Sequence, residues 1–428
     1  AFLTTQVGGR PVKLDISREE TFCNTRTRHS IEFDLAAGVG KDGRLLAKDM
    51  HSYSNQGAYA SHGHAIAANG LTSWRLQYAC PNIRGEAYTI YTNTPVGGAM
   101  RGYGIPQVCF AIESFMDDVA NEIHMDPLEF RRKNLIQGYY EDAYLKPIAA
   151  NTNGIFECLE KGAEYIHWDE KRKEYAEQAG DVRKGVGMAL FSYKTGVWPI
   201  SLEIAGARLS LNQDGSVQLM LGATEIGQGA DTVFSQMVAE TLHTDMEHVH
   251  IKTVQDTDVS PFDTGAYASR QSFVTGTAVR HCAEILRDKI LAYAKTLLPE
   301  IDTRELTLKD NWIWAGDEQA ISLAALAEES YYSLTNSSVL TAEVSEQVKK
   351  NTIATGCCFA EVEVDIKLGK IKILHIINVH DSGKLLNPQL AEMQVHGGMS
   401  MGMGYGISEQ LILDEKTGRP LNGNLLDY

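Results

Sequence analysis

Residues 217–242 read VQLMLGATEIGQGADTVFSQMVAETL and join three kinds of local structure. Alternating apolar residues at 217–221 are typical of a half-buried strand. Gly222 to Gly229 follows as a glycine-rich segment, and the later apolar residues recur three and four apart, which predicts a helix. Because backbone N–H groups at a helix start attract anions, this layout indicates an anion-binding loop. The segment lacks the Gly-Lys-Ser/Thr ending of a P-loop, so hydrolysis of a nucleoside triphosphate is disfavoured and Gln228 becomes the neutral hydrogen-bonding side chain at the turn.

The surrounding sequence mixes hairpins with separate helices. Residues 207–211 with 217–221, and 361–365 with 370–379, alternate apolar and polar side chains across a glycine turn, which predicts two β-hairpins. A helix is expected over 106–123, where apolar residues recur three and four apart. Because strands and helices do not alternate regularly, we expect the α+β fold class.

The length of 428 residues favours two or three domains with a large core. The chain becomes polar and weakly patterned between residues 134 and 185. We therefore expect a first domain at 1–150, a connection at 151–185 and a second domain at 186–428.

Charge and cysteine usage exclude several classes of protein. Thirty-nine Lys and Arg against 55 Asp and Glu give a net charge of −16, which repels nucleic acid and anionic membrane surfaces. No apolar run approaches the roughly 18 residues of a membrane span. Seven cysteines without C-x-x-C indicate neither a disulfide framework nor a four-cysteine metal site, so we expect a cytoplasmic protein. Ala1 opens no signal peptide and is expected to be an internal residue of a longer chain.

Three more glycine-rich or small polar segments could let backbone approach a bound group. Gly97 to Gly104 holds Arg101 between glycines just before a helix, which suits gripping an anion, although a solvated arginine in an ordinary loop is the alternative. Residues 265–273 precede another helix and form either an anion cradle or a capped loop. Residues 387–406 begin a helix at Asn387 and accumulate glycines, which indicates a bound group or close packing of another helix.

Other apparent motifs lack the context that their chemistry needs. Gly38 to Gly43 matches G-x-G-x-x-G but lies where residues 30–46 predict a hairpin turn, so a dinucleotide site is not expected. His62-Gly63-His64 and His248-Val249-His250 have no third ligand at a recognisable spacing. Asp381-Ser382-Gly383 lacks the strand and helix that frame a hydrolase nucleophile.

Four ordered segments, residues 98–107, 222–229, 268–272 and 386–398, resemble the molybdopterin-binding part of the xanthine dehydrogenase/aldehyde oxidase family. The likeness covers essentially the whole chain and is nearest to bacterial xanthine dehydrogenases whose molybdenum subunit is separate. It implies two domains of mixed α/β layers that bind molybdopterin, in its simple or its dinucleotide form.

The resemblance also implies roles for individual residues. Arg101, Gln228 and Gln394 would hydrogen-bond the pterin or the oxygens around molybdenum, and Ala268 would place its backbone against the metal, near which Arg101 also lies. The phosphate side of the cofactor would be held by Ser269, Gln271 and Ser272, and the cofactor-binding set is completed by Met100, Gly102, Gly229 and Arg270.

Four residues correspond to substrate positions of the family. Tyr103 would form one wall of a slot for a flat heterocycle. Asn69 and Val197 stand where the animal enzymes have a purine-gripping arginine and a stacking phenylalanine, and Trp198 would replace the missing stacking surface. Met100 is a departure from the aromatic residue that the family often has beside its arginine.

The implied function is molybdenum-dependent hydroxylation of a purine-like heterocycle, xanthine or hypoxanthine, with water as the oxygen source. Electrons would pass to [2Fe–2S] and FAD on partner subunits, because this chain has neither an iron–sulfur cysteine spacing nor a dinucleotide fingerprint. The alternatives are a sister hydroxylase of nicotinate-like heterocycles or aldehydes, and a non-catalytic scaffold that lacks the cofactor.

The resemblance also places two family features outside this chain. A Gly-Gly-Phe-Gly-Gly-Lys segment would precede Ala1, and the catalytic glutamate would lie beyond Tyr428. We therefore expect a fragment without a catalytic residue of its own, completed by the remaining piece of the molybdenum subunit.

Overall fold

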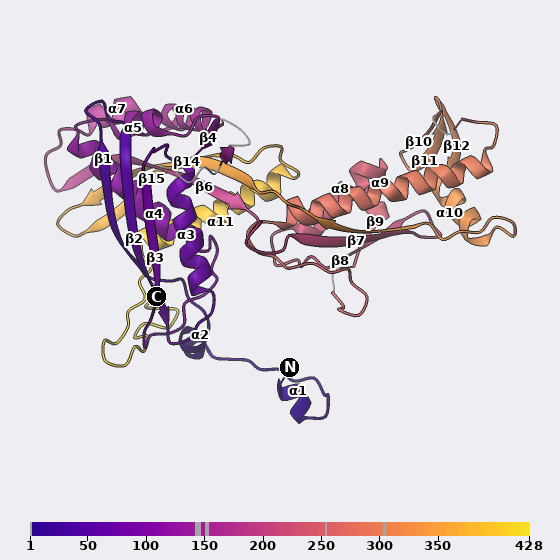
Figure 1. The fold of residues 1–428 in the computed structure, drawn as a ribbon, viewed down its shortest axis with the longest axis horizontal. Helices are drawn as coiled ribbons and strands as arrows, with labels where there is room; N and C mark the ends of the chain where they lie inside the picture. Colours follow the sequence, from indigo (N-terminus) through magenta and orange to yellow (C-terminus); the bar gives the residue numbers. More distant parts are fainter. Residues whose placement is uncertain (1, 142–146, 150–153, 253–254, 303–304) are drawn as a thin grey trace. The chain divides into compact units, whose positions relative to one another are not determined.

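A computed structural model describes residues 2–141, 147–149, 154–252, 255–302 and 305–428 (Figure 1). Ala1, and residues 142–146 and 150–153 around the expected domain connection, lie outside the described residues. The chain forms two compact units. Unit 1 contains Ala1–Tyr193, Ile353–Gly383 and Val395–Tyr428, and unit 2 contains Lys194–Thr352 and Lys384–Gln394.

Most elements of unit 1 come from the first part of the chain. In order they are α1 (Phe2–Gln6), α2 (Arg18–Asn24), β1 (Ile31–Val39), β2 (Leu45–Gly57), α3 (Gly63–Leu76), β3 (Ile83–Tyr91), α4 (Ile105–Glu122), α5 (Pro127–Asn134), β4 (Tyr139–Glu141), β5 (Pro147–Ala149), α6 (Gly154–Ile166), α7 (Trp168–Glu174), β6 (Val182–Thr195), β14 (Thr352–Asp365), β15 (Lys370–Asp381) and most of α11 (Pro388–Ile407).

A sheet of order β1-β2-β3 opens unit 1, with β1 antiparallel to β2 and β2 parallel to β3. The hairpin expected at residues 30–46 is confirmed. Its turn is closed by a hydrogen bond from the Gly40 amide to the Arg44 carbonyl, and Gly43 adopts a φ of +83°, so the G-x-G-x-x-G match is a hairpin turn. Helix α3 packs on β2 and β3, and α4, expected at 106–123, packs on β1 and α3 (Figure 1).

The described part of the expected connection at 151–185 belongs to unit 1 and is mainly helical. Helices α6 and α7 bury Leu159, Ile166 and Trp168 in the same core as Phe359 of β14. Strands β15 and β14 form a sheet with β6, so a segment beyond residue 350 returns to this unit. Unit 1 is therefore assembled from three segments, which differs from the contiguous division at 1–150 and 186–428.

Unit 2 consists of two sheets and their helices. Its elements are β7 (Ile204–Leu211), β8 (Val217–Leu221), α8 (Ala230–Leu242), η1 (Met246–His248), β9 (Val249–Ile251), α9 (Gln271–Leu297), β10 (Leu306–Lys309), β11 (Trp312–Ala315), β12 (Glu318–Ser322), α10 (Leu323–Tyr332) and β13 (Thr341–Gln347), with the first turns of α11.

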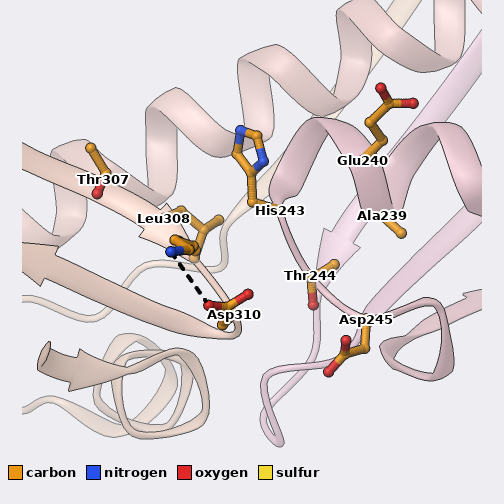
Figure 2. A pocket seen from close by; sticks show the side chains of 9 residues that line it. Ala239, Glu240, His243, Thr244, Asp245, Thr307, Leu308 and Asp310 are labelled. Atoms are coloured by element: carbon orange, nitrogen blue, oxygen red, sulfur yellow. Dashed lines mark ion pairs between the residues drawn. The ribbon is translucent and has the colours of Figure 1, made fainter.

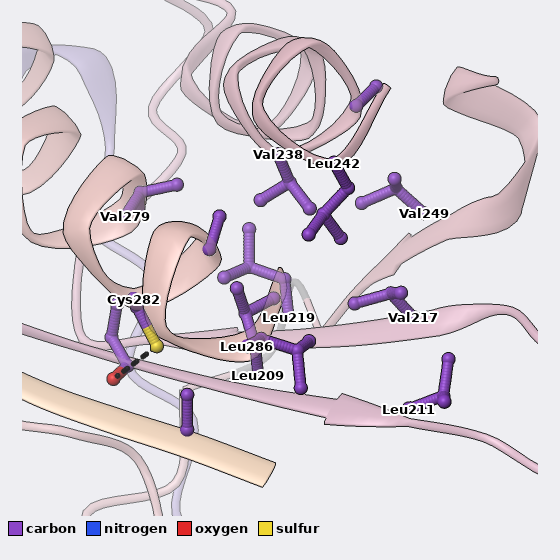
Figure 3. Close-up of a cluster of buried hydrophobic side chains, with 14 of the residues drawn as sticks. Leu209, Leu211, Val217, Leu219, Val238, Leu242, Val249, Val279, Cys282 and Leu286 are labelled. Carbon is purple, nitrogen blue, oxygen red and sulfur yellow. Dashed lines mark hydrogen bonds between the residues drawn. The ribbon is translucent and has the colours of Figure 1, made fainter. Parts of the chain in front are cut away.

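The core of unit 2 lies between the sheet β13-β7-β8-β9 and the helices α8 and α9 (Figure 3). The expected hairpin is confirmed as β7 and β8, in which Leu211 pairs with Val217. Leu209 and Leu219 of the sheet point toward Val238 of α8 and Leu286 of α9, and all four are buried (Figure 3). Burying each such side chain stabilises the unit by roughly 1.5–3 kcal/mol. This packing fixes the start of both helices, where the candidate loops lie.

The mixture of helices with mainly antiparallel sheets confirms the α+β class. Among the helices that the structure describes, none combines the length and the apolar character needed to cross a bilayer.

Candidate functional site

The glycine-rich loop of unit 2 joins β8 to α8, as the sequence predicts. The amides expected to receive an anion are occupied by the carboxylate of Glu225, which accepts hydrogen bonds from Gly227 (2.6 Å), Gly229 (3.1 Å) and Asp231 (3.1 Å). Burial opposes ionisation of Glu225, but these amides outweigh it and lower the pKa of its carboxyl. The anion at this helix start is therefore part of the protein.

Gln228 is directed by the same loop toward a second predicted cofactor residue. Its Oε1 accepts from the Ile226 amide at 2.6 Å, and its Nε2 donates to the Thr224 carbonyl at 3.0 Å and to Gln271 Oε1 at 2.6 Å. Gln271 in turn donates to the Thr224 carbonyl at 3.2 Å. The structure thus joins the glycine loop to the start of α9, 43 residues away in the chain.

The start of α11 packs against this loop. A Cβ at Gly229 would lie 2.7 Å from Leu390 Cδ1, and Gly229 adopts a φ of +83° that favours glycine. Asn387 caps the helix as expected, because its Oδ1 accepts from the Leu390 amide at 3.0 Å. Gln394 is exposed and ends the α11 segment that belongs to unit 2.

The third loop, residues 265–272, holds two consecutive non-glycine residues in the left-handed region. Ala268 has a φ of 49° and Ser269 a φ of 52°. Such conformations cost roughly 1–3 kcal/mol each and persist where neighbours fix them. Ser269 and Ser272 are exposed, whereas Gln271 is buried. The backbone of Ala268 is therefore held in an unusual conformation at the position that the resemblance assigns to the metal.

Arg270, which the sequence assigns to the cofactor set, lies with its side chain fully buried among protein acceptors. Nε donates to Glu203 (2.6 Å), Nη1 to Asp263 (2.6 Å) and to the Gly265 carbonyl (3.1 Å), and Nη2 to the Ile204 carbonyl (2.7 Å). With these contacts the guanidinium holds the 265–272 loop in its conformation.

Two of the predicted substrate residues lie beside that loop. The Gly196 amide donates to the Ala268 carbonyl at 2.8 Å, which places Val197 and Trp198 next to it in unit 2. Both side chains are partly exposed. The structure thus places two predicted substrate residues of unit 2 next to the loop of Ala268.

In unit 1, the Arg101 loop contains three successive left-handed residues, Gly102 (φ 93°), Tyr103 (φ 50°) and Gly104 (φ 94°). A Cβ at Gly397 of α11 would lie 3.1 Å from Arg101 Nη1. The glycine therefore lets the helix backbone lie beside the guanidinium. The sequence suggested that the α11 glycines allow close approach of a bound group or of another helix. At Gly397 the group that approaches is instead the side chain of Arg101.

The other two predicted substrate residues, Asn69 and Tyr103, are in direct contact in unit 1. Asn69 Nδ2 donates to the Tyr103 carbonyl at 2.9 Å, and His62 Nδ1 lies 2.7 Å from the Tyr103 hydroxyl oxygen. Burial raises the pKa of Tyr103, so its phenol stays protonated at neutral pH. Asn69 thereby fixes the backbone from which the aromatic ring projects. Met100 is exposed, and its carbonyl accepts from the Tyr103 amide at 2.8 Å.

Arg28 is a further residue of this region that the sequence analysis did not select. Its Nη2 donates to the Arg101 carbonyl at 2.7 Å, and its guanidinium lies 5.0 Å from the centre of the Tyr405 ring. Its Nε and Nη1 are buried without a hydrogen-bond partner. Arg28 precedes β1 and belongs to no periodic pattern, so no local sequence signal selects it.

A separate cleft of about 670 Å³ lies at the opposite end of α8 from the Gln228 loop. Figure 2 shows Glu240, His243 and Asp245 on one side and Asp310 on the other. None of the predicted site residues lines it, and we do not assign the site there.

Comparison with known proteins identifies related chains. Models of the molybdopterin cofactor-binding domain match residues 1–135 and 161–428. The chain is 46% identical to a putative xanthine dehydrogenase molybdenum-binding subunit of Escherichia coli, over 100% of this chain and 57% of the relative. A probable hypoxanthine oxidase of Escherichia coli is 32% identical, over 99% of this chain and 44% of the relative.

Solved structures show the same fold. The structure of quinoline 2-oxidoreductase from Pseudomonas putida superposes with a TM-score of 0.89 at 23% identity, covering 100% of this chain and 56% of that protein. The chain therefore spans about half the length of the relatives that it matches.

Proposed function

Because this chain belongs to the family of molybdopterin cofactor-binding domains, we propose that it provides most of the cofactor-binding part of a xanthine dehydrogenase-type molybdenum hydroxylase. The observation that supports this most is in unit 2, where the Gln228–Gln271 hydrogen bond joins two of the loops that the family resemblance selects. The strained backbone of Ala268 lies three residues before Gln271.

The side chains fit such a cofactor, which combines a hydrogen-bonding pterin with an anionic phosphate. In unit 1, the two buried, unpartnered donors of Arg28 lie beside the Arg101 loop and suit an anionic group. In unit 2, the paired amides of Gln228 and Gln271 hold the glycine loop against the start of α9, and exposed Ser269 and Ser272 offer hydroxyls. We propose Arg101 within unit 1, and Ala268 within unit 2, as residues that would contact the cofactor.

When bound, the molybdenum cofactor supplies the transfer of an oxygen atom from water to an electron-poor carbon and takes up two electrons. This chain's residues position the reactants. Gln228 and Gln271, which hydrogen-bond each other and the Thr224 carbonyl, would hold the glycine loop in place beside the pterin. The small side chain of Ala268 would leave its backbone accessible. Tyr103 in unit 1 and Trp198 in unit 2 each offer an aromatic surface of the kind on which a planar ring stacks.

We propose a purine-like heterocycle, xanthine or hypoxanthine, as the substrate, and the 46% identity to the putative xanthine dehydrogenase subunit supports this choice. Electrons would leave through [2Fe–2S] and FAD on partner subunits.

A sister hydroxylase of nicotinate-like heterocycles or aldehydes is the second candidate. Asn69 favours it, because the Nδ2 of this side chain is hydrogen-bonded to the Tyr103 carbonyl and carries no charge with which to grip a purine oxygen.

The experiment is a substrate profile of the complete protein with its electron-transfer partners. Turnover of xanthine or hypoxanthine at least tenfold above that of nicotinate and benzaldehyde, judged by kcat/KM, supports the purine assignment. Turnover of an aldehyde or nicotinate alone contradicts it and favours the sister hydroxylase. No turnover together with an empty cofactor site favours the non-catalytic scaffold.

A further inference from the structure

We propose that Glu203 is a positioning residue that holds the substrate-side loop 194–201 of unit 2 against the cofactor-side loop 265–272. The inference rests on the proposed function, which assigns the first loop to the substrate and the second to the cofactor. Glu203 itself lies directly before β7 and belongs to neither loop.

Three consecutive residues of the substrate-side loop are held through their backbone, each by a different partner. These hydrogen bonds run from the Gly196 amide to the Ala268 carbonyl (2.8 Å), from the Val197 amide to Glu203 Oε1 (2.5 Å) and from Asn351 Nδ2 to the Trp198 carbonyl (2.6 Å).

The second oxygen of Glu203 connects this loop to the cofactor side. Oε2 accepts from Arg270 Nε at 2.6 Å, and the two side chains are 1% and 0% exposed. Arg270 is itself fixed by Asp263 at 2.6 Å and by the Ile204 carbonyl at 2.7 Å. Because a buried charge left without its partner is costly, neither side chain can leave this arrangement easily. One carboxylate therefore bridges the two loops, an arrangement that we call the Glu203 clamp.

The backbone of both loops requires such a restraint. Ala268 and Ser269, directly before Arg270, keep left-handed conformations that neighbours must maintain. Gly196 has a φ of +82°, and a Cβ there would lie 2.9 Å from Glu203 Oε1. The substrate-side loop can approach the carboxylate this closely because residue 196 is glycine.

The consequence is that the Trp198 and Val197 surface keeps a fixed position relative to the Ala268 backbone. A misplacement of about 1 Å between a substrate and a reacting group can reduce the rate roughly 100-fold. The Glu203 clamp thus acts on the orientation of the substrate without touching it.

Hydrogen exchange of the complete protein tests the clamp, with Glu203→Gln and Gly196→Ala as the variants. Glu203→Gln replaces the oxygen or the charge that bridges the loops, and Gly196→Ala presses the loop away while leaving the buried ion pair intact. We expect amide exchange in peptides covering residues 194–201 to quicken about tenfold or more in both variants. Gly187→Ala on β6 is the matched control, because a Cβ there would meet no described atom within 4 Å.

Steady-state kinetics then separates positioning from folding. The clamp predicts that Glu203→Gln raises KM for the heterocycle about tenfold or lowers kcat/KM by that factor, with unchanged molybdenum content per subunit. Unchanged exchange at 194–201 in both variants, once folded, overturns the proposal, as does faster exchange with unaltered KM and kcat. If Glu203→Gln fails to fold, Gly196→Ala decides. If both variants exchange faster but the complete protein contains no molybdenum, the clamp is supported and only the proposed function is overturned.

Discussion

Arg28 Nη2 donates a hydrogen bond to the carbonyl oxygen of Arg101 at 2.7 Å, across 73 residues of sequence. Arg28 thereby supports the backbone of Arg101. The remaining buried donors of Arg28, Nε and Nη1, add positive charge to the same region of unit 1. A buried guanidinium with two unused donors is stabilised when an anionic group accepts hydrogen bonds from them.

Replacing Arg28 with methionine should therefore weaken binding of the cofactor. Loss of a charge-assisted hydrogen bond costs about 1.5–3 kcal/mol, which corresponds to roughly 10- to 150-fold in affinity. The pterin released per subunit after extensive dialysis measures the effect. Arg44→Met in the exposed β1–β2 turn is the control, and equal pterin loss in the two variants would refute a specific role for Arg28.

Gly397 should respond to alanine differently from Gly402 on the same helix. A Cβ at Gly397 would lie 3.1 Å from Arg101 Nη1, whereas one at Gly402 would meet no described atom within 4 Å. Gly402→Ala is expected to raise the free energy of unfolding by up to about 1 kcal/mol through helix propensity. Gly397→Ala should raise the free energy of unfolding by less, because the new methyl group meets Arg101, and it should lower the cofactor content. Denaturant titration and pterin analysis of both variants provide the comparison, and identical behaviour would contradict the assigned contact.

Asn69→Ala should raise KM for the heterocycle about tenfold with a smaller change in kcat, because Tyr103 loses the hydrogen bond that fixes its backbone. Asn82→Ala removes a comparable bond, from Nδ2 to the Leu46 carbonyl, on the exposed surface of unit 1 and serves as the control. Steady-state kinetics of the complete protein gives the answer. An unchanged KM in Asn69→Ala would remove Tyr103 from the substrate site.

Glu225→Gln should loosen the Gln228 loop. In the wild type, three backbone N–H groups of the loop donate to the two carboxylate oxygens of Glu225. A glutamine at this position has one acceptor oxygen and no charge, so about 1 kcal/mol of stability should be lost. The lowered pKa of Glu225 means that this contribution is present above the ordinary carboxyl pKa and disappears as the pH falls below it. Thermal unfolding at pH 7 and pH 3 measures this. A stability difference between wild type and variant that is the same at both pH values would be inconsistent with the ionised carboxylate.

Glu361 gives a second pH-dependent contribution, in unit 1. Burial alone would raise its pKa, but hydrogen bonds from Lys171, Tyr175 and His375 outweigh burial and lower the pKa to about 2. Because the folded pKa lies below the unfolded value of 4.5, this stabilisation is complete above pH 4.5 and is lost as the pH falls toward 2. Glu361→Gln should lose on the order of 2 kcal/mol at pH 7.

Acid titration of the unfolding free energy tests this expectation. The curves of wild type and Glu361→Gln should converge between pH 4.5 and 2, whereas Glu363→Gln on the same strand should run parallel to wild type. Curves for Glu361→Gln that never approach wild type in acid would contradict the role of the ionised carboxylate.

Local patterns in the sequence predicted the hairpins and helices well, because each depends on residues a few positions apart. The β7–β8 hairpin, α4 and the Asn387 cap are examples. Which segments of the chain form unit 1 could not be predicted in this way. Strands β14 and β15 return to β6 after unit 2, and nothing in their alternation says which sheet they join.

The candidate site shows the same division. Motif order selected Gln228, Gln271 and Ala268, whose loops the structure brings together within unit 2. The contacts that fix those loops were not visible, since Glu203 and Arg270 are 67 residues apart and either could have been a solvated charge. The contacts of Glu225 could have been predicted from the sequence, because its carboxylate accepts hydrogen bonds from the amides of its own loop.

The molybdenum and pterin content of the complete protein, measured for wild type and for Gln228→Ala, tests whether this chain holds the cofactor. We expect about one molybdenum and one pterin per wild-type subunit and a clear deficit of both in the folded variant. A folded wild-type protein that contains neither, or a Gln228→Ala variant that retains the full complement, would contradict this expectation.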